Sequence, residues 1–184
     1  NKNDNFSKNI INAGINATSQ LNAIKKFIEL NEIKKTIFLT PDADFKNEIR
    51  KAISSSKIKI LENYIYNTDP TKLTKQIEKI TRYEIRKQNL EDEITRLKKS
   101  NQNNKERLIE KLKKRDTLGN VNFDSVIISD FDESLKSVTT SLLYTDVSPK
   151  NKYFITLNQW FDESLLKETS SQPLYFPSAN KKNY

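Results

Sequence analysis

One pattern occurs twice in this chain, and it constrains the fold more than any other feature. Residues 123–135 (FDSVIISDFDESL) and 153–165 (YFITLNQWFDESL) each give an apolar run followed by Phe-Asp-Glu-Ser-Leu, and the copies lie thirty residues apart. A short β-branched or aromatic run is typical of a buried strand. Asp132 and Asp162 suit the start of a helix, where free amides and the helix dipole favour negative charge. The repeat therefore predicts βαβ units and a parallel sheet.

The rest of the chain extends this alternation. We expect strands near residues 36, 58, 125, 153 and 174. A first helix at 19–31 precedes them, and helices connect successive strands. Asp42 is expected to cap the helix after the first strand, and Asp69 or Thr68 the helix after the second. The prediction is an α/β fold with a doubly wound, five-stranded, mostly parallel sheet, forming one lobe over residues 1–184.

Residues 71–115 depart from the alternation and carry the whole charge excess. The formal net charge is +8, and this segment holds 15 Lys and Arg against 7 Asp and Glu, while the remainder has 17 of each. Apolar residues at helical spacing run from Leu73 to Leu97 and resume at Leu108, after a polar loop at 100–104. We therefore expect a long basic helical hairpin, inserted between the second and third strands.

Composition removes several classes of function. Cysteine and histidine are absent, which excludes disulfides, thiolate chemistry, the commonest general base and the commonest transition-metal ligand. No activated nucleophile or glycine-rich phosphate loop is recognisable, so we expect no enzyme activity, no cofactor and no metal site. No run approaches the ~18 apolar residues of a membrane helix. Because methionine is absent, we expect a piece of a longer protein.

Motifs near the second copy of the repeat follow a recognisable order. A helix ending in Tyr-x-Asp is followed by a strand and then by Trp-x-Asp at a helix start; the residues are Tyr144, Asp146, the strand at 153–157, Trp160 and Asp162. This order resembles the second lobe of type I periplasmic binding proteins, the leucine/isoleucine/valine-binding superfamily. The resemblance implies one lobe of a two-lobed receptor whose first lobe is missing from this chain.

A second set of motifs lies in and after the basic segment. In chain order these are Tyr-x-x-Arg-x-x-x-Leu at Tyr83, Arg86 and Leu90, Asp-Thr-x-Gly at 116–119, and Phe-Asp at 123–124. They resemble the penicillin-binding protein activator branch of that superfamily, whose members are lipoproteins of alphaproteobacteria. This likeness spans roughly residues 10–178. It implies a non-catalytic periplasmic domain of an outer-membrane lipoprotein. The implied role is regulation of peptidoglycan synthesis by contact with a penicillin-binding protein, a cell-wall synthase.

Two other functions stay open. The first is a solute-binding receptor of an ABC transporter for branched-chain amino acids or related small molecules. Against it, family members carry Tyr-Gly where this chain has Asp44 and Phe45, and such glycines allow a backbone to approach a small ligand closely. The second is nucleic-acid binding by the basic hairpin. Its interspersed acids and its near lack of stacking aromatics, apart from Tyr83, argue against that. A membrane is expected to be contacted only through a lipid anchor outside this chain.

Candidate ligand-binding residues follow the carboxyl ends of the predicted strands, where ligands bind in open parallel sheets. They are Asp42, Asp44, Asp130, Gln159 and Trp160. They would line a cleft facing the missing first lobe. For Asp42 the competing interpretation, a helix cap, is favoured, while for Asp130, Gln159 and Trp160 a cleft role and a purely structural role are both open.

Overall fold

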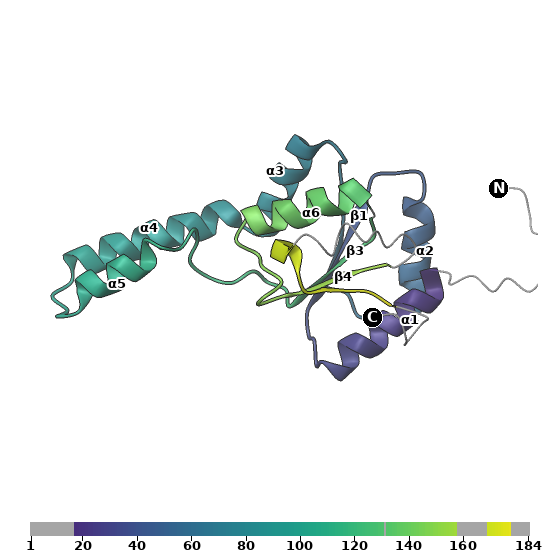
Figure 1. Ribbon diagram of the computed structural model, residues 1–184, viewed down its shortest axis with the longest axis horizontal. Coiled ribbons are helices and arrows are strands. Elements are labelled where there is room, and N and C mark those ends of the chain that lie inside the picture. Colours follow the sequence, from purple (N-terminus) through teal and green to yellow (C-terminus); the bar gives the residue numbers. More distant parts are fainter. Residues whose placement is uncertain (1–16, 131, 158–168, 178–184) are drawn as a thin grey trace, which may run out of the picture.

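The computed structural model describes residues 17–130, 132–157 and 169–177, and a single parallel sheet lies at its centre (Figure 1). The strands are β1 (Thr36–Pro41), β2 (Glu62–Tyr66), β3 (Ser125–Ile128), β4 (Tyr153–Thr156) and β5 (Leu174–Tyr175). Their order is β2-β1-β3-β4-β5, and every neighbouring pair is parallel. The predicted five-stranded sheet is confirmed. Its two repeated strands, β3 and β4, are direct neighbours, with Val126 opposite Phe154.

Helices cover both faces of the sheet, as a doubly wound fold requires. Within the described part of the chain, the covering helices are α1 (Ala17–Leu30), α2 (Lys46–Ser56), α3 (Pro70–Ile80) and α6 (Asp132–Tyr144). Phe38 and Ile127 belong to the core cluster under α1 and α2, whereas their chain neighbours Ile37 and Val126 belong to the cluster under α3 and α6. Successive strand side chains point to opposite faces, so a strand buried on both faces appears in the sequence as a continuous apolar run.

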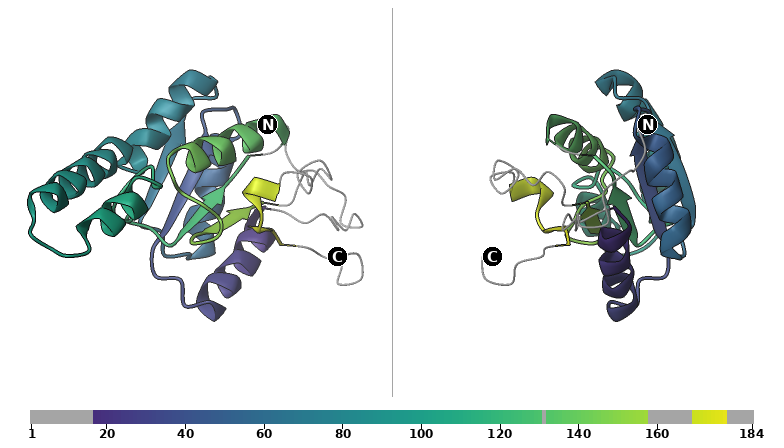
Figure 2. Two further views of the ribbon diagram at one scale, coloured as in Figure 1. Left: turned by 60° about the vertical axis from the view of Figure 1, so that its left-hand side comes forward. Right: turned by 90° about the vertical axis from the view of Figure 1, so that its right-hand side faces the viewer.

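The connection between β2 and β3 contains two parts that behave differently. Helix α3 buries Leu73 and Ile77 in the core, and it is the crossover helix between β2 and β3. Beyond it, α4 (Tyr83–Lys99) and α5 (Lys105–Leu112) pack on each other and project away from the sheet (Figures 1 and 2). We call residues 83–112 the helical arm. None of the described helices is both long enough and apolar enough to cross a membrane.

The expectation of one continuous helix from Leu73 to Leu97 is wrong. The helix breaks between α3 and α4, where Arg82 takes a left-handed backbone conformation with φ of 53°. The buried Thr81 closes α3, since its amide and its hydroxyl both donate to the Ile77 carbonyl, at 2.9 and 2.8 Å. The break redirects the chain, and the arm starts along a new axis.

The second strand is shorter than predicted. It begins at Glu62 rather than at Ile58. The Ile58 amide donates to the Ser56 hydroxyl at 3.3 Å, and the Ile58 side chain packs in the core cluster under α1 and α2. The alternation of Ile58 and Ile60 therefore reflects core packing by a connecting loop, and not a paired strand.

Of the caps predicted for the helices after the first and second strands, one is confirmed. Asp69 caps α3, because its carboxylate accepts a hydrogen bond from the Lys72 amide at 3.0 Å. The prediction for Asp42 is wrong: α2 begins at Lys46, and its N-cap residue is Phe45, which makes no side-chain capping bond.

Candidate functional site

The carboxyl edge of the sheet brings together three of the five predicted site residues. Asp42 follows β1 and Asp130 follows β3, and these strands are neighbours, while Asp44 lies in the turn beyond β1. Gln159 and Trp160 lie outside the described residues, as does Asp162. The common edge therefore carries acidic side chains from adjacent strands, at the position where ligands of parallel sheets bind.

Asp42 and Asp44 are exposed on this edge. The Asp42 amide donates to the Tyr66 carbonyl at 2.8 Å, which holds the turn after β1 against the end of β2. Its carboxylate forms an ion pair with the ammonium of Lys46, the first residue of α2. An exposed pair of this kind contributes little to stability, and both groups stay accessible to a partner.

Asp130 is buried and forms a pair with a tyrosine on another strand. The hydroxyl of Tyr66, at the end of β2, donates a hydrogen bond to Oδ2 of Asp130. Burial, and then the Asp130 carboxylate with its charge and its hydrogen bond, raise the pKa of the Tyr66 phenol far above its ordinary value. Tyr66 is therefore a permanent donor at physiological pH, and the pair ties β2 to β3 across the intervening β1.

Other polar groups near the strand ends also bond within the lobe. Thr40 in β1 donates to the Asn63 side chain at 3.2 Å, and Thr156 in β4 donates to the Ile128 carbonyl at 3.1 Å. The described residues contain no cluster of three acidic side chains arranged to hold a metal ion. Of the predicted residues of this edge that the structure describes, Asp42 and Asp44 are the accessible charges.

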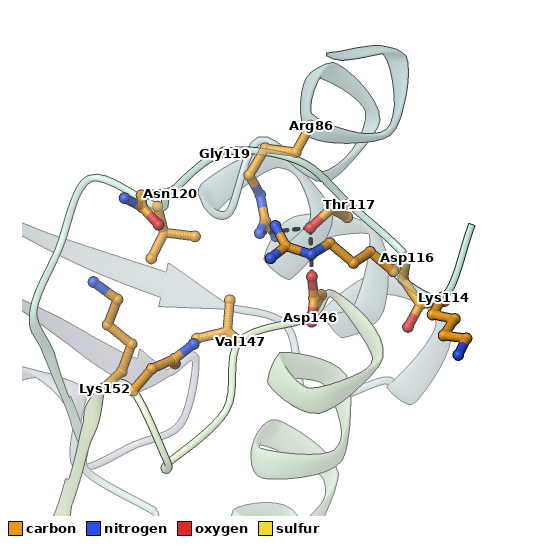
Figure 3. Close-up of a pocket in the computed structure, with 12 residues that line it drawn as sticks. Arg86, Lys114, Asp116, Thr117, Gly119, Asn120, Asp146, Val147 and Lys152 are labelled. Atoms are coloured by element: carbon orange, nitrogen blue, oxygen red, sulfur yellow. Dashed lines mark hydrogen bonds between the residues drawn. The ribbon is translucent and has the colours of Figure 1, made fainter. Parts of the chain in front are cut away.

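A cavity lies at the opposite, amino edge of the sheet, where the arm returns to β3. It has a volume of about 370 Å³ and an almost entirely polar lining (Figure 3). Its charged lining residues are Arg86, Lys114, Arg115, Asp116, Asp146 and Lys152. Arg86 comes from α4, Asp116 from the loop after α5, and Asp146 from the end of α6 (Figure 3). The cavity therefore forms where three separate parts of the chain meet.

Arg86 connects these parts. Its Nε donates to the Thr81 carbonyl at 3.0 Å, its Nη1 donates to the Thr117 hydroxyl at 3.1 Å, and its Nη2 donates to the Thr145 carbonyl. The Thr117 hydroxyl in turn donates to the Asp146 carboxylate at 2.5 Å (Figure 3). Burial lowers the pKa of Arg86, and the nearby Asp146 charge acts in the opposite direction. A guanidinium remains charged under such a shift, so Asp146 balances a permanent cation.

The returning loop is shaped to fit this arginine. The Leu118 amide donates to the Arg86 carbonyl at 2.9 Å, and Gly119 follows with φ of +110°, a conformation that favours glycine. We call Arg86, Thr117, Gly119 and Asp146 the arm root. The sequence had marked these positions only through a resemblance. A usable signal was present, because Tyr83, Arg86 and Leu90 share one face of α4, and all three are buried.

Comparison with known proteins gives a match at the level of structure alone. No protein-family model and no curated protein matches this sequence. Among solved structures, the chain is similar to an extracellular ligand-binding receptor from Verminephrobacter eiseniae EF01-2, with a TM-score of 0.52 and 12% sequence identity. The match covers 91% of this chain and 39% of the receptor chain, so this chain spans well under half of the receptor's length. The shared feature is the fold, and its extent is that of one lobe.

Proposed function

We propose that this chain is one lobe of a two-lobed, non-catalytic binding protein of the type I periplasmic kind, and that its carboxyl edge faces the other lobe. The observation that carries the proposal is the extent of the structural likeness, which covers 91% of this chain but 39% of a ligand-binding receptor. Asp42, Asp44 and Asp130, with Gln159 and Trp160, are the residues that we assign to this edge. Binding between two lobes needs neither an activated nucleophile nor a metal.

The arm root supports a more specific assignment, to a protein like the penicillin-binding protein activators. Arg86 belongs to one motif of that resemblance and Thr117 and Gly119 to another, while Asp146 belongs to the wider resemblance to type I periplasmic binding proteins. These residues form one packed unit. The motif order thus corresponds to a single structural feature. We therefore propose that the protein regulates peptidoglycan synthesis in the periplasm by contacting a penicillin-binding protein, and that its membrane attachment is a lipid anchor outside this chain.

The carboxyl edge favours a protein partner over an enclosed amino acid. Asp130 is bonded to Tyr66 within the lobe, whereas Asp42 and Asp44 are accessible on the surface. Exposed charges on a rim suit contact with a second protein, since they steer association and select the partner. The structural likeness to a ligand-binding receptor favours a second candidate, an ABC-transporter receptor for a branched-chain amino acid or a related solute.

Two measurements on the full-length protein separate these functions. Thermal unfolding with branched-chain amino acids tests the receptor, because a ligand at 100 times its Kd stabilises the folded state by about 2.7 kcal/mol. We expect no shift. Immobilised protein should instead retain a purified penicillin-binding protein from the same organism, and the double variant Asp42→Lys, Asp44→Lys should lose this retention. Glu29→Lys, at an exposed position of α1, makes the same change of charge per site and is the control.

A clear thermal shift with an amino acid, together with no retention of the synthase, would replace the activator assignment by the receptor. Binding to DNA or RNA that weakens steeply with added salt would contradict both.

A further inference from the structure

The cavity at the amino edge has a charge balance that the proposed function does not use. Arg86, Lys114, Arg115 and Lys152 line it against two carboxylates, so its lining carries two positive charges in excess. The Arg86 charge is balanced by Asp146 through the Thr117 hydroxyl. The excess therefore belongs to Lys114, Arg115 and Lys152.

These three cations have few partners of their own. Lys152 approaches the Asp124 carboxylate only to 4.0 Å. Lys114 and Arg115 are exposed, and neither side chain makes an ion pair or a hydrogen bond with any residue that the structure describes. A concave, protein-walled surface concentrates the field of such charges and raises the local concentration of a small anion.

The remaining lining residues indicate what else a ligand must carry. Asp116 and Asp146 would repel a bare anion, but their oxygens accept hydrogen bonds from hydroxyl groups. The side chains of Asn120 and Asn151 offer both amide donors and amide oxygens to the cavity. Among the residues that the structure describes, no aromatic side chain lines the cavity, which disfavours a nucleobase or another flat apolar ligand.

From this arrangement we propose that the cavity is a binding site for a small hydroxylated anion, a sugar that bears a phosphate or a carboxylate. Arg115 and Lys152 bind the anionic group, and Lys114, which lies on the opposite side of the cavity from Lys152 (Figure 3), adds only to the positive field. Asp116 and the two asparagines accept and donate hydrogen bonds to the hydroxyls. A volume of about 370 Å³ suits one such ring. The site lies at the edge opposite Asp42 and Asp44, so it is independent of the proposed function, and either can fail without the other.

Isothermal titration of the whole chain with glucose 6-phosphate, glucuronate, glucose and inorganic phosphate tests the assignment. We expect binding of at least one of the two sugar anions and no measurable binding of glucose. The sugar anion that binds more tightly, glucose 6-phosphate or glucuronate, shows whether phosphate or carboxylate is preferred. Arg115→Gln and Lys152→Gln should each weaken binding about tenfold or more, which corresponds to the loss of one charge-assisted hydrogen bond.

Matched variants separate a built site from general attraction to a basic protein. Lys98→Gln and Lys99→Gln remove the same charge at the far end of α4 and should leave the affinity unchanged. Asp116→Ala should weaken binding of the sugar anion but not that of inorganic phosphate, because it removes a hydroxyl acceptor and a repulsive charge together.

Three results would overturn the proposal. These are no binding of either sugar anion, glucose binding as tightly as its 6-phosphate, or an equal loss of affinity in the Lys98 and Lys152 variants. Thermal unfolding of each variant checks that the fold is intact. We expect no change for the Lys98 and Arg115 variants, because both residues are exposed and neither belongs to the arm root.

Discussion

Arg86 shows how a single buried cation can act as a structural residue. A buried charge is costly unless it is paired and hydrogen-bonded, and this guanidinium uses all three of its nitrogens, with Asp146 as the balancing charge one hydroxyl away. A lysine could not reproduce this geometry, because its ammonium is a single point and not a planar fork. The residue therefore determines how the arm is attached to the lobe.

Arg86→Met should destabilise the protein by about 3 kcal/mol, because it leaves two buried carbonyls and the Thr117 hydroxyl without their donor. Arg86→Lys should restore only part of this loss. The free energy of unfolding from urea titration measures both. Arg96→Met is the control, since Arg96 is exposed and pairs with Glu93 on the same helix, so a much smaller change is expected. Equal effects of the Met variants at 86 and 96 would show that the arm root is unimportant for stability.

The Tyr66 and Asp130 pair should give the protein a specific sensitivity to alkali. The folded state holds the pKa of Tyr66 above its ordinary value, so between the two pKa values the unfolded chain loses a proton that the folded chain keeps. The contribution of this pair to the free energy of unfolding is fully present below about pH 10. It falls as the pH rises further, by about 1.4 kcal/mol per pH unit for one proton.

Tyr66→Phe removes both the hydrogen bond and this proton. At pH 7 we expect a loss of about 1–3 kcal/mol in the free energy of unfolding, since the buried Asp130 carboxylate loses a donor. The difference from the unmodified protein should then shrink as pH rises above about 10. Urea titrations over a series of alkaline pH values measure it. A difference that stays constant with pH would mean that Tyr66 ionises as it does in the unfolded chain.

Among the elements, the arm is the one whose connection the sequence could not predict. Its helical periodicity was correctly recognised, and so was the polar loop between α4 and α5. The break before it was not, because Thr81 and Arg82 include neither glycine nor proline, and the left-handed Arg82 is a consequence of tertiary structure. Likewise, Ile58 alternates with Ile60 because a loop contributes to the core, which a local pattern cannot distinguish from a strand.

The outer part of the arm should be removable. We propose to replace residues 94–110 with a short glycine-asparagine linker, which keeps the arm root and the turn that contains Leu90. None of the residues in the two core clusters lies in the deleted segment. Circular dichroism should therefore show a folded lobe whose free energy of unfolding changes by less than about 1 kcal/mol. Loss of cooperative unfolding in the trimmed chain would show that the arm stabilises the lobe along its whole length.

At the scale of the whole molecule, the sheet could be predicted from the sequence because two of its strands carry the same repeated pattern. β3 and β4 carry the repeated pattern and lie side by side, and their apolar runs indicated burial on both faces. The candidate site was predictable only in part. The topology rule placed Asp42 and Asp130 at one edge, but the bond from Tyr66 to Asp130 joins residues 64 positions apart, and no local pattern encodes it.

One sheet shared by two core clusters should make the lobe unfold as a unit. Ile24 in α1 and Ile77 in α3 lie in different clusters, on opposite faces of the sheet. Ile24→Val and Ile77→Val should each cost about 0.5–1.5 kcal/mol, and the double variant should show their sum, because distant sites are additive. Circular dichroism and tyrosine fluorescence should follow one common urea transition in all three. Two separate transitions would show that the faces unfold independently.

Because the arm is rooted at the amino edge, it offers a handle that is remote from the rim where a second lobe would close. A fluorophore, an affinity tag or a fused reporter placed at the loop between α4 and α5 would lie at the end of the helical arm, away from Asp42 and Asp44. The labelled protein could then be immobilised or tracked by that tip, with the opposite rim left unobstructed for its partner.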